Sequence, residues 1–183
     1  MAADDSRSAI GALGLVVALL VGLVVLPRVL AFHGTSLVGR DGPDFSLSLV
    51  ANGADLGGDG QPLTMGRLRG HAVLLDFWAT WCPPCRVEAP IVDQIAKRWR
   101  DRGVVVVGVN TDTPDQGDPR EFALSHGLSY PIVQDVAGEA SRLYEIANIP
   151  TLVVLSRSGK VVAVRTGITD DGEIERLLRQ AQD

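Results

Sequence analysis

The two cysteines of this 183-residue chain, Cys82 and Cys85, are separated by Pro83 and Pro84. The thiolate is the nucleophile in thiol–disulfide exchange, and unpaired N–H groups and the dipole at a helix N-terminus favour it over the thiol. The spacing lets the second thiol displace a partner joined to the first. Prolines fit the first helical positions, whose N–H groups have no helical partner. The pattern therefore predicts a redox-active dithiol at the beginning of a helix.

Zinc binding and a purely structural disulfide are the alternatives for this pair. A structural zinc site needs four ligands, and the three histidines, His33, His71 and His126, are scattered without a second cysteine pair. A disulfide across two residues closes a loop too short to restrict the unfolded chain much. We therefore expect redox chemistry with no metal and no other cofactor.

Alternating strand and helix patterns must position the dithiol. An apolar segment, 72–78, predicts a buried strand that carries one acid, Asp76, and 83–101 predicts the helix after it. The β-branched segment 104–109 is typical of a strand buried on both faces of a parallel sheet. The other predicted elements are an N-terminal hairpin of strands 45–50 and 62–64, helices over 119–126, 137–146 and 171–182, and a hairpin of strands 151–155 and 161–165. This alternation predicts an α/β fold with helices on both faces of the sheet.

An apolar segment near the N-terminus divides the chain into unlike parts. Residues 9–26 hold no charged side chain, and as a helix at ~1.5 Å per residue they would extend about 27 Å, close to the ~30 Å hydrocarbon core. We predict a short head at 1–8, an uncleaved transmembrane signal-anchor at 9–26, a linker at 27–42 and a folded domain at 43–183. A cleaved signal peptide is the alternative, although the segment is longer than usual for one.

The composition and charge exclude one class of partner, and the apolar segment indicates a compartment. The chain is 46% hydrophobic with a formal net charge of −5, and without a basic stripe it is not expected to bind nucleic acid. A membrane anchor followed by a redox dithiol suits an oxidising compartment. We therefore expect a single-pass protein of a bacterial inner membrane with its catalytic domain on the periplasmic, extracytoplasmic side.

Residues 75–90 (LDFWATWCPPCRVEAP), residues 144–151 (YEIANIPT) and Gly167 resemble the thioredoxin superfamily. Within it the chain is similar to the membrane-anchored TlpA/ResA-like thiol–disulfide oxidoreductases. The resemblance extends from about Gly39 to the C-terminus. It implies a thioredoxin-like fold with an N-terminal β-hairpin and a central insertion, preceded by one transmembrane helix.

The resemblance also implies a role for individual residues. Cys82 would be the exposed attacking thiol and Cys85 the buried resolving thiol. Asp76 and Glu88 would transfer protons, and burial of Asp76 among apolar neighbours predicts a raised pKa. The residues that would contact substrate are Trp81, Pro83, Pro84, Ile149, Pro150 and Gly167, with a cis peptide bond at Pro150.

The implied reaction is reduction of protein disulfides outside the cytoplasm, with electrons from a membrane thiol donor of the DsbD or CcdA type. Apocytochrome c is one candidate substrate, although Asn148-Ile-Pro-Thr stands where the cytochrome-maturation subgroup favours Gly-Ala-Pro-Glu. The alternatives are a dithiol oxidase or isomerase, a peroxiredoxin-like peroxidase and a non-catalytic anchored binding module.

Overall fold

The computed structural model describes residues 37–183. The predicted head, the predicted membrane anchor and residues 27–36 of the predicted linker lie outside the described residues. Within 37–183 no helix is both long and apolar enough to span a bilayer.

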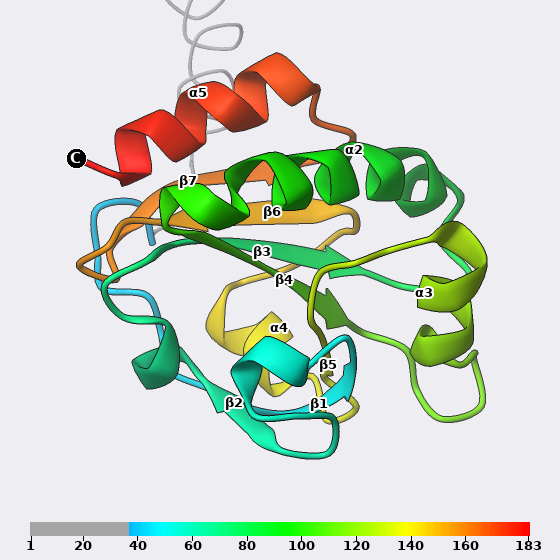
Figure 1. Ribbon diagram of the computed structural model, residues 1–183. Coiled ribbons are helices and arrows are strands. Elements are labelled where there is room, and N and C mark those ends of the chain that lie inside the picture. Colours follow the sequence, from blue (N-terminus) through cyan, green and yellow to red (C-terminus); the bar gives the residue numbers. More distant parts are fainter. Residues whose placement is uncertain (1–36) are drawn as a thin grey trace, which may run out of the picture. The chain divides into compact units, whose positions relative to one another are not determined.

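A seven-stranded sheet in the order β2-β1-β5-β4-β3-β6-β7 forms the centre of the described part (Figure 1). The strands are β1 (Ser46–Ala51), β2 (Pro62–Thr64), β3 (Ala72–Trp78), β4 (Val104–Asn110), β5 (Ile132–Gln134), β6 (Thr151–Leu155) and β7 (Val161–Thr166). Strands β3, β4 and β5 run parallel, and the other pairings are antiparallel. The predicted α/β sheet and both predicted hairpins are confirmed.

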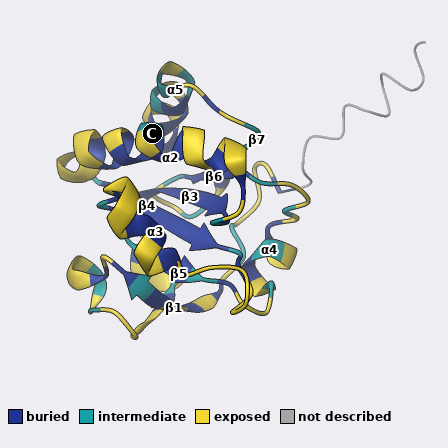
Figure 2. Cartoon of the chain, turned by 90° about the vertical axis from the view of Figure 1, so that its right-hand side faces the viewer, coloured by how far each residue is buried: buried dark blue, intermediate teal, exposed yellow. Residues whose placement is uncertain are grey.

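Helices cover both faces of this sheet. They are α2 (Pro83–Trp99), α3 (Pro119–His126), α4 (Glu139–Leu143) and α5 (Asp171–Ala181), with 3-10 turns η1 (Ala54–Leu56), η2 (Met65–Leu68) and η3 (Arg100–Arg102). Residues of α2, α3 and α5 share one hydrophobic core, and residues of η2 and α4 share the core on the other face. Figure 2 shows the central strands buried between these layers.

The alternation of side chains along β3 decides what faces the dithiol. Leu74 and Trp78 belong to the core under α2, whereas Leu75 and Phe77 belong to the opposite core. Since successive side chains of a strand point to opposite faces, Asp76 lies on the face covered by α2.

The main differences from the prediction concern two helices and one strand. Helix α4 spans only Glu139–Leu143, because Gly138 before it is left-handed and Glu145 after it has φ 55°. Helix α2 ends at Trp99, and the three residues beyond form η3 instead. Strand β5 is absent from the prediction. It has only three residues, and its place between β1 and β4 makes the N-terminal hairpin part of the main sheet.

Candidate active site

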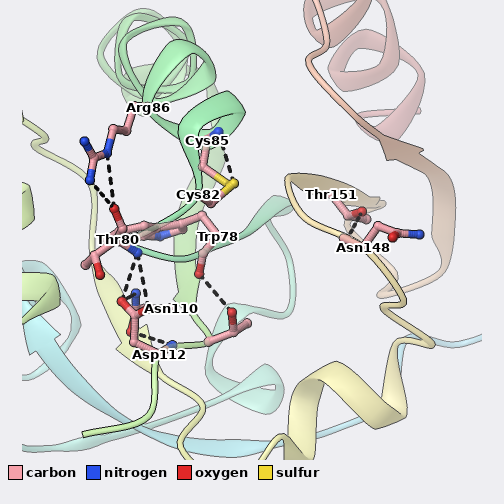
Figure 3. The surroundings of a disulfide bond; sticks show 10 residues. Trp78, Thr80, Cys82, Cys85, Arg86, Asn110, Asp112, Asn148 and Thr151 are labelled. Carbon is pink, nitrogen blue, oxygen red and sulfur yellow. Dashed lines mark hydrogen bonds between the residues drawn. A yellow bond between two sulfur atoms is a disulfide. The ribbon is translucent and has the colours of Figure 1, made fainter. Parts of the chain in front are cut away.

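Cys82 and Cys85 form a disulfide bond at the N-terminus of α2, with 5.3 Å between their Cα atoms (Figure 3). Cys82 is the N-cap residue, and its sulfur accepts a 3.2 Å hydrogen bond from the backbone N–H of Cys85. Pro83 and Pro84 occupy the first helical turn, where a missing N–H leaves no bond unmade. The predicted placement of the dithiol at the beginning of a helix is confirmed.

Cys82 is buried in this disulfide form, and the expectation of an exposed attacking sulfur is wrong for it. Both cysteines are 2% exposed. The N-cap geometry turns the Cys82 side chain inward toward the Cys85 N–H, within the core that also holds Trp78. Trp81, by contrast, is 52% exposed, and both prolines are exposed, so residues around the disulfide form the accessible surface.

A buried carboxylate holds the segment that leads into the dithiol. Asp112 is fully buried. Its Oδ2 accepts hydrogen bonds from the Thr80 N–H at 3.0 Å and from Asn110 Nδ2 at 2.8 Å (Figure 3). The Arg86 guanidinium donates to the Thr80 carbonyl at 2.8 and 3.2 Å. Sequence reasoning missed this network; the signal was an acid just beyond the carboxyl end of β4, at the edge where β3 also ends.

The loop before β6 carries two of the predicted substrate-contacting residues, Ile149 and Pro150. The Ile149–Pro150 peptide bond is cis, as predicted, and Ile149 packs against the core that contains both cysteines. The Gly167 N–H donates to the Pro150 carbonyl at 2.9 Å, which brings these residues together. Figure 3 draws the neighbouring Asn148 and Thr151 in the surroundings of the disulfide, joined by a 2.8 Å hydrogen bond.

Asp76 is 3% exposed on the face of β3 beneath α2. The pKa of its carboxyl is raised to about 8: burial and, next, the negative charge of Glu88 raise it, while a hydrogen bond from the Tyr130 hydroxyl lowers it. That bond joins Tyr130 Oη to Asp76 Oδ2 at 3.1 Å. Near neutral pH Asp76 is therefore mostly protonated, and its ionised fraction can accept a proton. Tyr130 was not predicted.

Glu88 is 1% exposed on α2. The pKa of its carboxyl is raised to about 7 because burial outweighs the lowering effect of the Thr169 backbone N–H, which donates to Oε1 at 2.8 Å. Its Oε2 is buried and finds no hydrogen-bond partner among the described residues. Because the two pKa values lie close to neutrality and the two carboxyls interact, the pair can take up or release a proton as the dithiol changes redox state.

No group of three or more histidine, cysteine or acidic side chains in residues 37–183 is arranged to hold a metal ion. The site therefore offers two sulfur atoms, two carboxyls of raised pKa and a loop with a cis proline. These are the parts needed for thiol–disulfide exchange, in which one sulfur attacks and the other resolves.

Fold and site together define a thiol–disulfide oxidoreductase with a thioredoxin-like fold. A model of the AhpC/TSA family matches residues 38–164, and the chain belongs to that family. It is 34% identical to the thiol-disulfide oxidoreductase ResA of Geobacillus thermodenitrificans over 141 residues, which are 77% of this chain and 76% of that protein.

The solved structures that share this fold include two thiol–disulfide proteins. A thiol:disulfide interchange protein of the thioredoxin family from Chlorobium tepidum has a TM-score of 0.65 at 30% identity and covers 77% of this chain and 94% of its own. A secreted disulfide oxidoreductase of Mycobacterium tuberculosis, homologous to Escherichia coli DsbE, has a TM-score of 0.61 at 25% identity and covers 74% and 95%. The predicted resemblance to ResA-like thiol–disulfide oxidoreductases is thereby confirmed.

Proposed function

We propose that this chain reduces disulfide bonds of protein substrates outside the cytoplasm, anchored to a bacterial inner membrane by residues 9–26. The observation that carries the proposal is the Cys82–Cys85 pair above two buried carboxyls that titrate near neutral pH. The uninterrupted apolar segment and the secreted relative from Mycobacterium tuberculosis support the location.

The proposed reaction begins with the Cys82 thiolate. It attacks one sulfur of the substrate disulfide, a mixed disulfide forms, and the other substrate sulfur leaves as a thiolate that takes a proton. Cys85 then gives its proton to Asp76 or Glu88 and attacks Cys82 Sγ. This step breaks the mixed disulfide, releases the second substrate thiol and leaves the Cys82–Cys85 disulfide. Two electrons have passed from the dithiol to the substrate.

The loop at Pro150 is the proposed docking site for the substrate. Ile149 is half-buried and Gly167, at φ 86°, lies beside it through its hydrogen bond to Pro150. An extended substrate segment would lie against the Ile149 backbone, between this loop and the exposed rings of Trp81, Pro83 and Pro84. Apocytochrome c is one proposed substrate, and a membrane thiol carrier of the DsbD or CcdA type is the proposed electron donor.

A trapping experiment tests substrate and donor together. Cys85→Ala leaves Cys82 unable to resolve a mixed disulfide, so partners accumulate as covalent adducts that dithiothreitol releases. Capture of extracytoplasmic disulfide proteins and of a membrane thiol carrier is expected. The matched control, Cys82→Ala, retains Cys85 and should capture neither. Exclusive capture of cytoplasmic proteins would contradict the proposed location.

The direction of the reaction is tested by redox equilibration. The reduced and oxidised forms are quantified in glutathione buffers. Since ~30 mV corresponds to ~1.4 kcal/mol for this two-electron couple, a reduction potential near the approximately −120 mV of DsbA would favour an oxidase over a reductase. Peroxide turnover without a disulfide substrate would favour the peroxidase, and full function of a Cys82→Ser variant would favour the binding module.

A further inference from the structure

Tyr130 brings a hydroxyl to a carboxyl 54 positions away in the sequence. Its Oη lies 3.1 Å from Asp76 Oδ2, and the two residues are 1% and 3% exposed. A donor buried with its acceptor has no water to replace the bond, so its loss is costly. The contact is therefore a fixed part of the environment of Asp76.

Gly108 makes this contact sterically feasible. It lies opposite Asp76 in the parallel register of β3 and β4. A Cβ on Gly108 would lie 3.0 Å from Tyr130 Cε2 and 2.9 Å from Trp78 Nε1, closer than ordinary van der Waals contact. The absence of a side chain on β4 at this point leaves the space in which the phenol ring reaches toward β3.

The N-terminal hairpin holds the backbone that carries Tyr130. At the end of β1, Asn52 donates from its side-chain amide to the carbonyls of Leu128 at 2.9 Å and of Tyr130 at 3.1 Å. Asn52 itself has φ 55°, a left-handed conformation that asparagine tolerates better than most residues. Two elements remote in the sequence, β1 and β4, therefore converge on one phenol.

Tyr130 also forms part of the wall of a cavity of about 180 Å³, together with Asn52, His71, Arg100 and Ser129. A volume of this size exceeds the share of liquid volume of one water, roughly 30 Å³. A small residue at position 130 would remove the whole ring, whereas phenylalanine removes only the hydroxyl.

We propose that Tyr130 is a positioning residue for the dithiol chemistry: its hydroxyl fixes Asp76 Oδ2, which leaves Oδ1 to exchange a proton beneath α2. The inference rests on the proposed function, in which Asp76 or Glu88 receives the proton of Cys85, and it concerns the route through Asp76. In this proposal Tyr130 controls the protonation of Asp76, and Gly108 and Asn52 contribute by placing Tyr130.

The charged groups around Tyr130 and Asp76 determine whether loss of the Tyr130 hydroxyl raises or lowers the pKa of Asp76. On α2, Glu88 raises the pKa of Asp76, and Glu88 and Asp93 both raise the pKa of Tyr130. The Tyr130 bond opposes burial and Glu88 because it stabilises the charged carboxylate. Without the hydroxyl only the raising influences remain, so the pKa of Asp76 should increase.

The direct test follows the Asp76 carboxyl by 13C NMR in the oxidised full-length protein, with Asp76→Asn to assign its resonance. Tyr130→Phe should move the titration upward by about one pH unit, as expected for the loss of one hydrogen bond to a charged oxygen. Tyr144→Phe is the matched control: that tyrosine is also fully buried, and its hydroxyl donates to the Pro43 carbonyl at 2.8 Å. An unchanged titration in natively folded Tyr130→Phe overturns the inference.

A second measurement separates this inference from the proposed function. The pH dependence of insulin disulfide reduction is compared in the original protein, Tyr130→Phe, Asp76→Asn and the double variant. Tyr130→Phe should shift the profile upward, and the shift should vanish when Asp76 is already replaced. If Asp76→Asn alters the profile and Tyr130→Phe does not, the role of Tyr130 is wrong. If Asp76→Asn changes nothing, the proposed proton transfer does not pass through Asp76 and this role of Tyr130 falls with it.

Discussion

The backbone N–H of Thr169 donates a 2.8 Å hydrogen bond to Glu88 Oε1 and joins the loop after β7 to the helix that carries the dithiol. The same loop contacts the cis-proline segment through Gly167 and Pro150. The proposed substrate groove and a buried acid of near-neutral pKa are thus connected by two hydrogen bonds, donated by backbone N–H groups only two residues apart.

Glu88→Gln should keep the hydrogen bond from Thr169 and remove the titratable carboxyl. The amide oxygen can still accept from Thr169, while the group with a pKa of about 7 is lost. The inflection near pH 7 in the rate of disulfide reduction should disappear, and the pKa of Asp76 should fall because a neighbouring negative charge is gone. Rates from about pH 5 to about pH 9 check this. Glu139→Gln, on the exposed surface of α4, should leave the profile unchanged; persistence of the inflection in Glu88→Gln would contradict the assignment.

Stability should fall as pH rises, because both raised pKa values favour the protonated, folded protein. The folded state binds more protons than the unfolded state from about pH 4, where free carboxyls titrate, up to about 7 for Glu88 and about 8 for Asp76. In that window the free energy of unfolding decreases with pH. Asp76→Asn should therefore be more stable than the original protein at about pH 8, by on the order of 2–4 kcal/mol.

Urea denaturation of the oxidised protein at several pH values measures this difference. Asp93→Asn is a control in which the substitution should lower, not raise, the free energy of unfolding. Lys97 and Ser129 hold the pKa of the Asp93 carboxyl below its usual value, despite an opposing effect of burial. Replacing Asp93 should reduce the free energy of unfolding at neutral pH. The difference from the original protein should become smaller at low pH, where the Asp93 carboxyl is protonated. A stability of Asp76→Asn that does not exceed that of the original protein at alkaline pH would refute the raised pKa.

Asp112→Asn should destabilise the segment that enters the dithiol. The two carboxylate oxygens accept hydrogen bonds from the Thr80 N–H at 3.0 and 3.3 Å, and one also accepts from Asn110. An amide can present only one oxygen there, and its NH2 group would face a donor. A loss of about 1–3 kcal/mol in unfolding free energy is expected, with slower disulfide reduction. Asp115→Asn, at an exposed carboxyl bonded to Thr113, should change stability by no more than about 0.5 kcal/mol. Equal effects of the two variants would contradict this account.

Gly167→Ala should impair substrate turnover beyond its effect on stability. Gly167 has φ 86°, and nothing within 4 Å would obstruct a Cβ, so the cost is conformational and about 1–2 kcal/mol. Gly127→Ala is the matched control, at φ 65° with equally open space after α3. Both should lower the melting temperature, whereas only Gly167→Ala should raise the KM for a disulfide substrate. Unchanged kinetics in Gly167→Ala would argue against a groove at this loop.

Features that depend on neighbours in the chain were predictable. The cysteine spacing with two prolines placed a dithiol at a helix N-terminus, and one acid in an apolar strand predicted the buried Asp76 and its raised pKa. Contacts between distant segments could not be predicted from the sequence. The bonds of Tyr130 to Asp76 and of Asp112 to Thr80 depend on strand order and register, which no local pattern contains. Strand β5 was missed because its three residues show no periodicity, and the burial of Cys82 follows from side-chain packing at the helix cap.

Residues 39–42 enter the domain at one end of the sheet. The N–H groups of Gly39 and Gly42 donate to the carbonyls of Val161 and Gly159, beside the turn that follows Leu155, and Leu155 pairs with Val73 at the beginning of β3. The dithiol follows the other end of β3, and seven residues at ~3.3 Å each separate the two by about 20 Å. The chain therefore enters the described domain at one end of β3 and carries the Cys82–Cys85 disulfide beyond the other end, so the full length of the strand separates the reactive sulfurs from the point of entry.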